Sequence, residues 1–297
     1  MMSKPNLLII GMGNMGSLHA KYADLLEVDW HWHDPSPLVG ADPDRCVISP
    51  HLYQPHLPYS HIIVATPAST HADHLRDLKD FEGRILVEKP GVMEVDDLPL
   101  LDNPLVSVGL VERFNPAFEA LAAKVDPSLV LNIDFIRCSA RPVSRIKENS
   151  FFDVGIHDID LFLQLFRGSS IDHIAVYSTS NTFCLMAKLD TKQVARFIWS
   201  NETFYKERMI KVRESYCNYE CNLIDQTVKR HSLSTDNKNT VEDVYVEKAS
   251  PLRRELEYFL GAPEMFSRIP TRVDSRESHR VFLDVLGRIN EMEKNDG

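Results

Sequence analysis

Residues 6–17 read NLLIIGMGNMGS, a short apolar run that leads directly into three closely spaced glycines. A continuous run such as Asn6–Ile10 is typical of a strand that is buried on both faces of a parallel sheet. The glycines form a GxGxxG motif, and a helix is expected over residues 17–28. In this context the glycines serve a tight turn, close approach of the backbone to a pyrophosphate, and helix–strand packing. The stretch therefore predicts a dinucleotide-binding unit.

A second strand is expected at residues 29–33 (DWHWH), and it ends at Asp34. An acid about 20 residues beyond the glycines accepts a hydrogen bond from the ribose 2′-hydroxyl. No arginine follows directly to hold a 2′-phosphate, so NAD is favoured over NADP. The alternative is that Asp34 only forms a turn before Pro35. The cofactor contacts expected from this part are Gly11, Met12, Gly13, Asn14, Met15, Gly16 and Asp34.

Two further strands are expected at residues 60–65 (SHIIVA) and 84–87 (RILV), with a helix from about residue 72. Alternation of strand and helix predicts a doubly wound α/β sheet whose ligands lie outside the carboxyl ends of the strands. We expect Lys89 there to hydrogen-bond a substrate hydroxyl, although a surface lysine after a strand is the plainer alternative. The residues expected to line this crevice are Thr66, Pro67, His71, Glu88 and Lys89.

Residues 151–166 read FFDVGIHDIDLFLQLF and place four titratable groups in an apolar segment. At helical spacing Asp153, His157 and Asp160 share one face. Such groups are costly to bury unless they are paired or used in function. The plain alternative is that Asp153 caps the helix and His157 is a satisfied core residue.

The composition excludes several classes of protein. The 297 residues allow two domains, and 43% hydrophobic with 26% charged residues is ordinary for a globular protein. A net charge of −10 argues against nucleic-acid binding. Five scattered cysteines, no signal peptide and no long apolar segment indicate a cytoplasmic protein without a membrane partner. His31 and His33 share a strand face but lack partners at metal-binding spacing, so no metal is expected.

Five stretches together resemble the Gfo/Idh/MocA family of nicotinamide-dependent oxidoreductases, which act on sugars, cyclitols and nucleotide-sugars. They are GMGNMGSLHAKY (11–22), VATPASTHADH (64–74), VEKP (87–90), VGLVERFNPA (108–117) and DVGIHDIDL (153–161). The resemblance implies an N-terminal Rossmann domain, residues 1–113, with a doubly wound parallel sheet. It also implies a C-terminal α+β domain, residues 114–297, for substrate binding and oligomerisation. The second domain should carry a large, open, mostly antiparallel sheet that pairs subunits into homodimers or homotetramers.

The same resemblance implies roles for individual residues. Lys89 matches the family's EKP lysine, which contacts substrate and cofactor. Asp153 and His157 match its D-x-x-x-H pair, in which the histidine is the acid/base for the hydroxyl being oxidised. A histidine suits that proton transfer at neutral pH. Asp158 and Asp160 are interpreted as structural or supporting residues.

ERFNPA (112–117), DVGIHDIDL (153–161) and SNETFYKERMIKV (200–212), followed by PLRRELEYFL (251–260), look closer to one branch of the family. This is the UDP-N-acetylglucosamine 3-dehydrogenase-like branch, which has tryptophan in the place of Glu202. Arginine and lysine match phosphate groups, so they are candidates for an anionic substrate. Lys206 and Arg208 could instead lie on a solvated strand face. Arg141, Arg145 and Lys147 are further candidates for binding phosphate, and the alternative for them is a solvated loop. The substrate contacts expected from the resemblance are Arg113, Asn115, Lys206 and Arg208.

The sequence therefore predicts an NAD-dependent oxidoreductase that transfers hydride between a sugar hydroxyl carbon and nicotinamide. The resemblance points to C3 of a UDP-N-acetylhexosamine-type nucleotide-sugar in polysaccharide biosynthesis. One alternative is a dehydrogenase or reductase of a free sugar or cyclitol. The other is a non-catalytic NAD-binding regulator, against which the intact Lys89, Asp153 and His157 argue.

Overall fold

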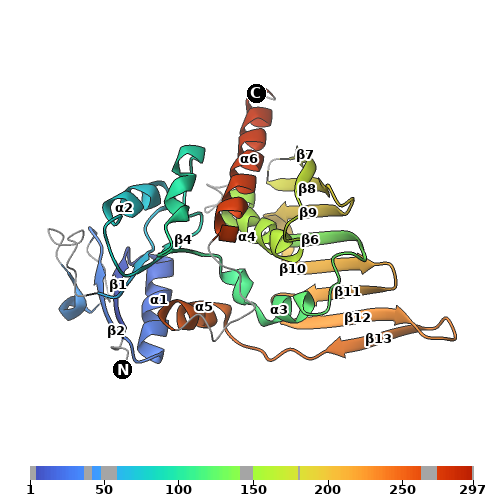
Figure 1. The fold of residues 1–297 in the computed structure, drawn as a ribbon, viewed down its shortest axis with the longest axis horizontal. Helices are drawn as coiled ribbons and strands as arrows, with labels where there is room; N and C mark the ends of the chain where they lie inside the picture. Colours follow the sequence, from blue (N-terminus) through green and yellow to red (C-terminus); the bar gives the residue numbers. More distant parts are fainter. Residues whose placement is uncertain are drawn as a thin grey trace. The chain divides into compact units, whose positions relative to one another are not determined.

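The computed structural model describes residues 5–36, 42–47, 59–140, 150–179, 181–261 and 273–295. The chain divides into two compact units (Figure 1). The first comprises Met1–Val111 and Leu252–Arg280, and the second comprises Glu112–Pro251 and Val281–Gly297. Among the described residues, no helix is both long enough and apolar enough to cross a membrane.

The first unit contains a five-stranded, wholly parallel sheet in the order β2-β1-β3-β4-β5. Its central strands carry continuous buried runs, because helices and turns flank both faces of such a sheet. This confirms the predicted doubly wound parallel sheet. The strands are β1 (Asn6–Ile10), β2 (Asp29–His33), β3 (His61–Val64), β4 (Arg84–Glu88) and β5 (Val106–Gly109), and the α-helices that follow β1 and β3 are α1 (Asn14–Leu25) and α2 (His71–Asp77).

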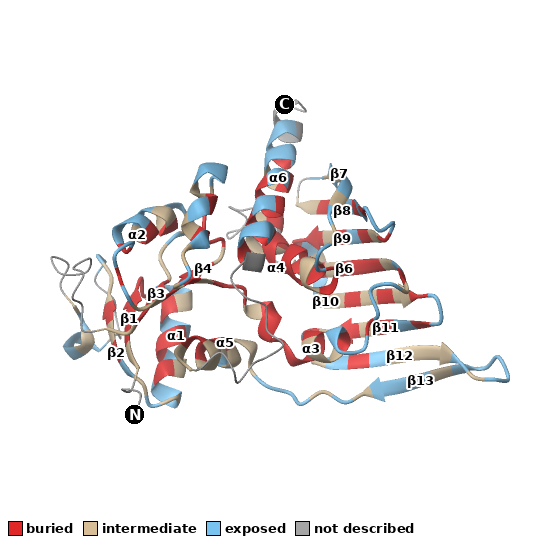
Figure 2. Cartoon of the chain, in the orientation of Figure 1, coloured by how far each residue is buried: buried red, intermediate tan, exposed pale blue. Residues whose placement is uncertain are grey.

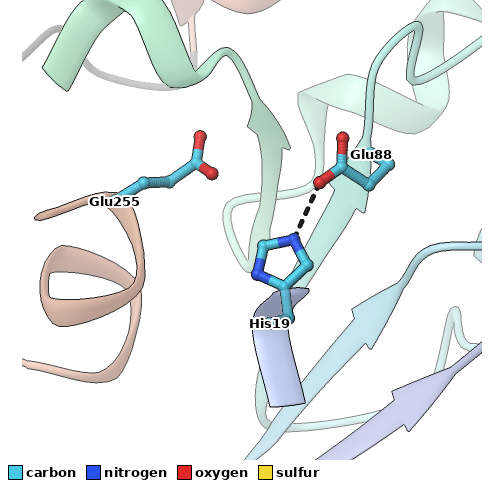
Figure 3. Close-up of side chains that lie close together, drawn as sticks. All are labelled: His19, Glu88 and Glu255. Atoms are coloured by element: carbon cyan, nitrogen blue, oxygen red, sulfur yellow. Dashed lines mark hydrogen bonds and ion pairs between the residues drawn. The ribbon is translucent and has the colours of Figure 1, made fainter. Parts of the chain in front are cut away.

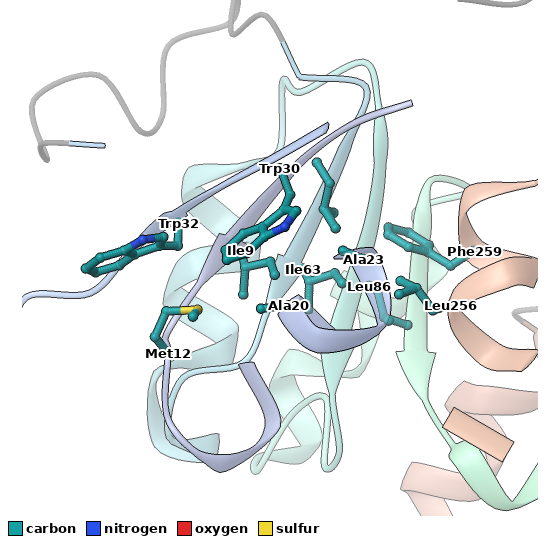
Figure 4. Packing of buried hydrophobic residues seen from close by; sticks show 11 residues of the cluster. Ile9, Met12, Ala20, Ala23, Trp30, Trp32, Ile63, Leu86, Leu256 and Phe259 are labelled. Carbon is teal, nitrogen blue, oxygen red and sulfur yellow. The ribbon is translucent and has the colours of Figure 1, made fainter. Parts of the chain in front are cut away.

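Helix α5 (Pro251–Leu260) also belongs to the first unit, whereas the sequence prediction placed all of residues 114–297 in the second domain. Its residues Leu256 and Phe259 are buried in one cluster with Trp30 and Ile9 (Figure 4). The Arg84 guanidinium also donates to the carbonyl of Phe259 at 3.2 Å. The apolar face of α5 thus completes the core of the first unit. The first boundary falls after Val111 rather than after residue 113.

The segment between β2 and β3 is described only in part. Its described residues include a 3-10 turn, Pro43–Arg45, and a parallel bridge between Trp32 and Cys46. The Trp32 indole donates to the carbonyl of Asp42 at 2.8 Å. Residues 37–41 and 48–58, which hold most of the prolines of this segment, lie outside the described residues.

The second unit contains an eight-stranded sheet in the order β13-β12-β11-β10-β6-β9-β8-β7. Only the β6–β9 pair is parallel, so the predicted mostly antiparallel sheet is confirmed. Its strands are β6 (Val130–Ala140), β7 (Ile171–Ser178), β8 (Thr182–Leu189), β9 (Val194–Ser200), β10 (Glu202–Glu214), β11 (Cys217–Asn222), β12 (Thr227–Leu233) and β13 (Asn239–Val244).

The core of the second unit forms between this sheet and helix α4 (Ser150–Leu165). Phe135 of β6 stacks on Phe197 of β9 with ring centroids 4.9 Å apart, and Phe162 of α4 meets both rings edge-on. Burial is concentrated in the middle strands and falls away toward β12 and β13 (Figure 2). Two further helices, α3 (Pro116–Ala122) and α6 (Val273–Asn295), complete the described α-helices.

Candidate functional site

The glycine loop joins β1 to α1 in the first unit, and each of its glycines has a different surrounding. Gly11 has a φ of +89°, and a Cβ there would lie 2.7 Å from the carbonyl oxygen of Ala65. A Cβ on Gly16 would lie 1.9 Å from the carbonyl oxygen of Gly11. At Gly13, by contrast, a Cβ would meet nothing within 4 Å. The loop thus needs glycine for its turn and its packing, and at Gly13 it leaves open space beside the start of α1.

Asp34 lies at the carboxyl end of β2, next to this loop. Its Oδ2 accepts from the amide of Met12 at 2.8 Å, and its Oδ1 accepts from the amide of Ser36 at 2.8 Å. A carboxylate has about four lone-pair sites, so acceptor capacity remains for a ribose hydroxyl. Asn14 is exposed and Met15 is half-buried, whereas the side chain of Met12 is buried in the core and its amide is already used by Asp34.

These observations fit a dinucleotide. An open, glycine-lined surface at the amino end of a helix favours a pyrophosphate, and a carboxylate follows on the neighbouring strand. Gly11, Gly13, Gly16 and Asp34 would hold the group.

The residues expected at the carboxyl end of β3 divide into two kinds. Thr66 is half-buried and Pro67 is exposed, so both remain accessible from solvent. His71, however, is only 1% exposed. Its Nδ1 lies 2.8 Å from the carbonyl oxygen of Pro90 and its Nε2 lies 2.9 Å from that of Thr66. His71 therefore binds backbone and does not reach the cofactor surface, contrary to the sequence interpretation.

Glu88, at the end of β4, is likewise turned into the fold. Its Oε1 lies 2.7 Å from Nε2 of the buried His19, and its Oε2 accepts from the amide of Lys89 at 3.3 Å. The carboxylate of Glu255 on α5 approaches the same pair (Figure 3). One ligand atom from each of these residues lies within 4.8 Å of the others, a spacing that a metal ion can bridge. The 2.7 Å contact is a hydrogen-bond distance, so we describe the group as a buried polar cluster.

The second unit carries the D-x-x-x-H pair on α4. Asp153 is half-buried in the first turn of the helix, and His157 is 7% exposed one turn further on. The neighbouring Asp158 accepts from the Arg137 guanidinium at 2.6 Å and from the Trp199 indole at 2.9 Å. The structural interpretation of Asp158 fits these contacts.

A second buried ion pair gives Asp160 and Arg113 a structural role. The Arg113 guanidinium donates to the two carboxylate oxygens of Asp160 at 2.6 and 2.5 Å, and both side chains are buried. Asn115 caps α3 by accepting from the amide of Ala117, and it donates to Glu112 and to the carbonyl of Leu223. The structure therefore does not favour Arg113 or Asn115 as a substrate contact, because their polar groups are already used inside the fold.

Glu112 connects this network to the candidate substrate cations. Its Oε1 accepts from Arg137 at 2.9 Å and from Arg208 at 3.1 Å. Burial alone would raise the pKa of Glu112, but the charges of Arg137, Arg208 and His157 outweigh it and hold that pKa at about 2. The sequence interpretation missed Glu112 because a lone glutamate in ERFNPA carries no signal of its partners.

Arg208 and Lys206 line a recess of about 450 Å³ between the first half of β10 and the β11–β12 connection. Arg208 is partly exposed and Lys206 is exposed, so both present positive charge to a ligand. Arg141, Arg145 and Lys147, the other candidates for phosphate, lie outside the described residues. The remaining residues of the recess are Tyr205, Glu207, Met209, Asn222, Ile224 and Asp225.

No protein-family model and no curated protein sequence matches the chain. Solved structures do match. A UDP-N-acetylglucosamine 3-dehydrogenase from Acidithiobacillus ferrooxidans has 18% identity and a TM-score of 0.79, over 96% of this chain and 97% of that one. A dehydrogenase from Clostridium difficile has 14% identity and a TM-score of 0.74, over 96% and 100%. An NAD-binding protein from Listeria innocua has 14% identity and a TM-score of 0.74, over 94% and 93%. The chain thus has the Gfo/Idh/MocA fold that the sequence motifs predicted.

Proposed function

We propose that this protein is an NAD-dependent oxidoreductase that transfers hydride between a sugar hydroxyl carbon and nicotinamide. The observation that carries the proposal is the open surface at Gly13, with Asp34 hydrogen-bonded to the amide of Met12 at its edge. This arrangement offers amides to a pyrophosphate and a carboxylate to a ribose in one place. The similar structures support it, because one is described as an NAD-binding protein and others as dehydrogenases.

The side chains of the chain itself supply proton transfer and orientation. A bound nicotinamide would supply the hydride acceptor for the carbinol carbon. His157 takes the hydroxyl proton as general base, and the ammonium group of Lys89 donates a hydrogen bond to the reacting oxygen. Asp153 lies one helical turn before His157 and orients the substrate from the same helix face.

The cofactor is NAD rather than NADP in this proposal. The Asp34 carboxylate would repel a 2′-phosphate, and no arginine or lysine follows it in residues 35–41 (PSPLVGA).

The proposed substrate is a UDP-N-acetylhexosamine-type nucleotide-sugar used in polysaccharide biosynthesis, and the reacting carbon is its C3. Lys206 and Arg208 support it, because their ammonium and guanidinium groups line one recess of about 450 Å³ and can donate hydrogen bonds to a diphosphate. A free sugar or cyclitol would have no need of these charges. The Acidithiobacillus ferrooxidans protein of similar structure is a UDP-N-acetylglucosamine 3-dehydrogenase.

The test measures NADH formation by purified protein with NAD and a panel of UDP-sugars, other nucleotide-sugars, free sugars and inositols. The proposal is supported if a UDP-sugar is turned over, if this turnover disappears in His157→Ala, and if the KM for the UDP-sugar rises in Lys206→Ala. Lys211→Ala is the matched control, because Lys211 lies on β10 opposite Asp134, on the other face of the sheet. Turnover of free sugars alone would discard the nucleotide-sugar, and no turnover with intact NAD binding would favour a regulator.

A further inference from the structure

Lys89 lies in a stretch of the first unit that is otherwise buried. In the segment from Ile85 to Val92, every residue is buried except Lys89, which is half-buried. The segment includes the end of β4 and the cis peptide bond between Lys89 and Pro90. The proposed catalytic lysine is thus the one residue of this stretch that is not fully buried.

On the amino-terminal side, His19 holds the segment through Glu88. His19 lies on α1 and is 0% exposed, and its Nε2 donates to Oε1 of Glu88 at 2.7 Å. The other carboxylate oxygen of Glu88 accepts from the amide of Lys89. A ring buried in the nucleotide-binding helix is thereby connected to the backbone of the lysine in two hydrogen bonds.

On the carboxyl-terminal side, two more buried histidines bind the next two residues. His71 of α2 bonds the carbonyl oxygen of Pro90 at 2.8 Å. The amide of Gly91 donates to Nε2 of His279 on α6 at 2.8 Å, and Nδ1 of His279 donates to the carbonyl of Ser275 at 2.6 Å. A Cβ on Gly91 would lie 3.4 Å from that Nε2 and 3.1 Å from Val108, so glycine allows the close approach.

We propose that His19, His71 and His279 act as positioning residues for Lys89, an inference that rests on the function proposed above. Three histidines from three different helices converge on consecutive residues of one short segment, and together they fix the backbone on both sides of the lysine. None of the three touches substrate in this account. Holding a catalytic group within a fraction of an ångström decides its contribution, because a misplacement of about 1 Å can cost about 100-fold in rate.

His279 offers a test in which two conservative variants differ in one hydrogen bond. In His279→Gln, the side-chain oxygen reaches the place of Nε2 and can accept from the Gly91 amide. In His279→Asn, the side-chain nitrogen takes the place of Nδ1 and keeps the bond to Ser275, but nothing reaches Gly91. We expect kcat to fall about 10- to 100-fold in the asparagine variant, with little change in the KM for NAD, and to be largely retained in the glutamine variant. Equal kcat values in both variants would overturn the proposal.

A second readout does not depend on turnover. The rate at which a trace of acetic anhydride acetylates Lys89 is measured by peptide mass spectrometry, relative to the exposed Lys21 and Lys79 of the same unit. We expect the asparagine variant to change this relative rate several-fold and the glutamine variant to leave it unchanged. If the wild type oxidises no sugar, the proposed function fails and the acetylation rates still decide the positioning. Lower thermal stability of the asparagine variant with an unchanged Lys89 rate would show a structural role only and overturn the proposal.

Discussion

Replacing Glu112 by glutamine removes a buried negative charge and almost no volume. Glu112 is 4% exposed and accepts from Arg137, Arg208 and Asn115. The pKa of its carboxyl is held at about 2, against an ordinary value of 4.5, because the neighbouring positive charges outweigh the effect of burial. The charged form is therefore stabilised in the folded protein relative to the unfolded chain.

The size of the effect follows from that pKa. At 1.36 kcal/mol for each pKa unit, the difference between 4.5 and about 2 corresponds to about 3 kcal/mol of folding free energy. Because the folded pKa lies below the unfolded one, this contribution is fully present above pH 4.5 and is lost as the pH falls toward about 2. Glutamine has no such dependence, so the gap between wild type and variant must narrow in acid.

Urea unfolding followed by circular dichroism measures this gap. We expect Glu112→Gln to be less stable by about 3 kcal/mol near neutral pH, and more than half of that gap to disappear by about pH 3. Glu247→Gln, which removes an exposed carboxylate of the same unit, should stay within about 0.5 kcal/mol of wild type throughout. A gap for Glu112→Gln that is constant across this range would refute the electrostatic account of the network.

Three further predictions follow from packing. Gly13→Ala should weaken NAD binding in calorimetry at unchanged thermal stability, because its Cβ enters the open space proposed for the pyrophosphate. Gly16→Ala should instead lower thermal stability, because its Cβ would lie 1.9 Å from the carbonyl oxygen of Gly11. Equal effects of the two variants would contradict the assignment of the loop. Leu256→Ala should cost about 2–5 kcal/mol in urea unfolding, since this α5 side chain is fully buried in the first unit, and a cost below about 1 kcal/mol would argue against that packing. Met186 is exposed on the face of the sheet opposite to the buried Leu185. If subunits pair through this face, Met186→Glu should lower the molecular mass measured by light scattering. An unchanged mass would exclude this face as the subunit interface.

The parallel sheet was predictable because its signals are local. Strands β1, β3 and β4 are continuous apolar runs, each followed by a turn, and the glycine motif fixes the first connection. The sequence also placed the carboxyl ends of these strands together correctly. What it did not give was the direction of individual side chains, since His71 and Glu88 point into the fold and Thr66 does not.

The affiliation of α5 could not be read from the sequence. Its amphipathic pattern shows that Leu256 and Phe259 need an apolar partner, but any core would satisfy that pattern. Similarly, the sequence alone does not distinguish Arg113 from Arg208 as a candidate substrate contact. Only tertiary structure shows that Arg113 is enclosed with Asp160, while Arg208 is partly exposed beside Glu112.

His279 shows the same limit at the candidate site. It lies 190 residues beyond Lys89 in the sequence, and no motif connects the two. The contact from the Gly91 amide to its ring exists only because α6 packs against the segment that follows β4.

The central claim is hydride transfer from a sugar carbon to NAD, and isotope labelling tests it most directly. UDP-N-acetylglucosamine carrying deuterium at C3 is incubated with the protein and NAD, and the recovered NADH is analysed by mass spectrometry. We predict that the NADH carries the deuterium, and that none forms with His157→Ala. NADH without deuterium would place the oxidation at another carbon, and the absence of NADH from every labelled or unlabelled sugar would contradict the assignment as an oxidoreductase.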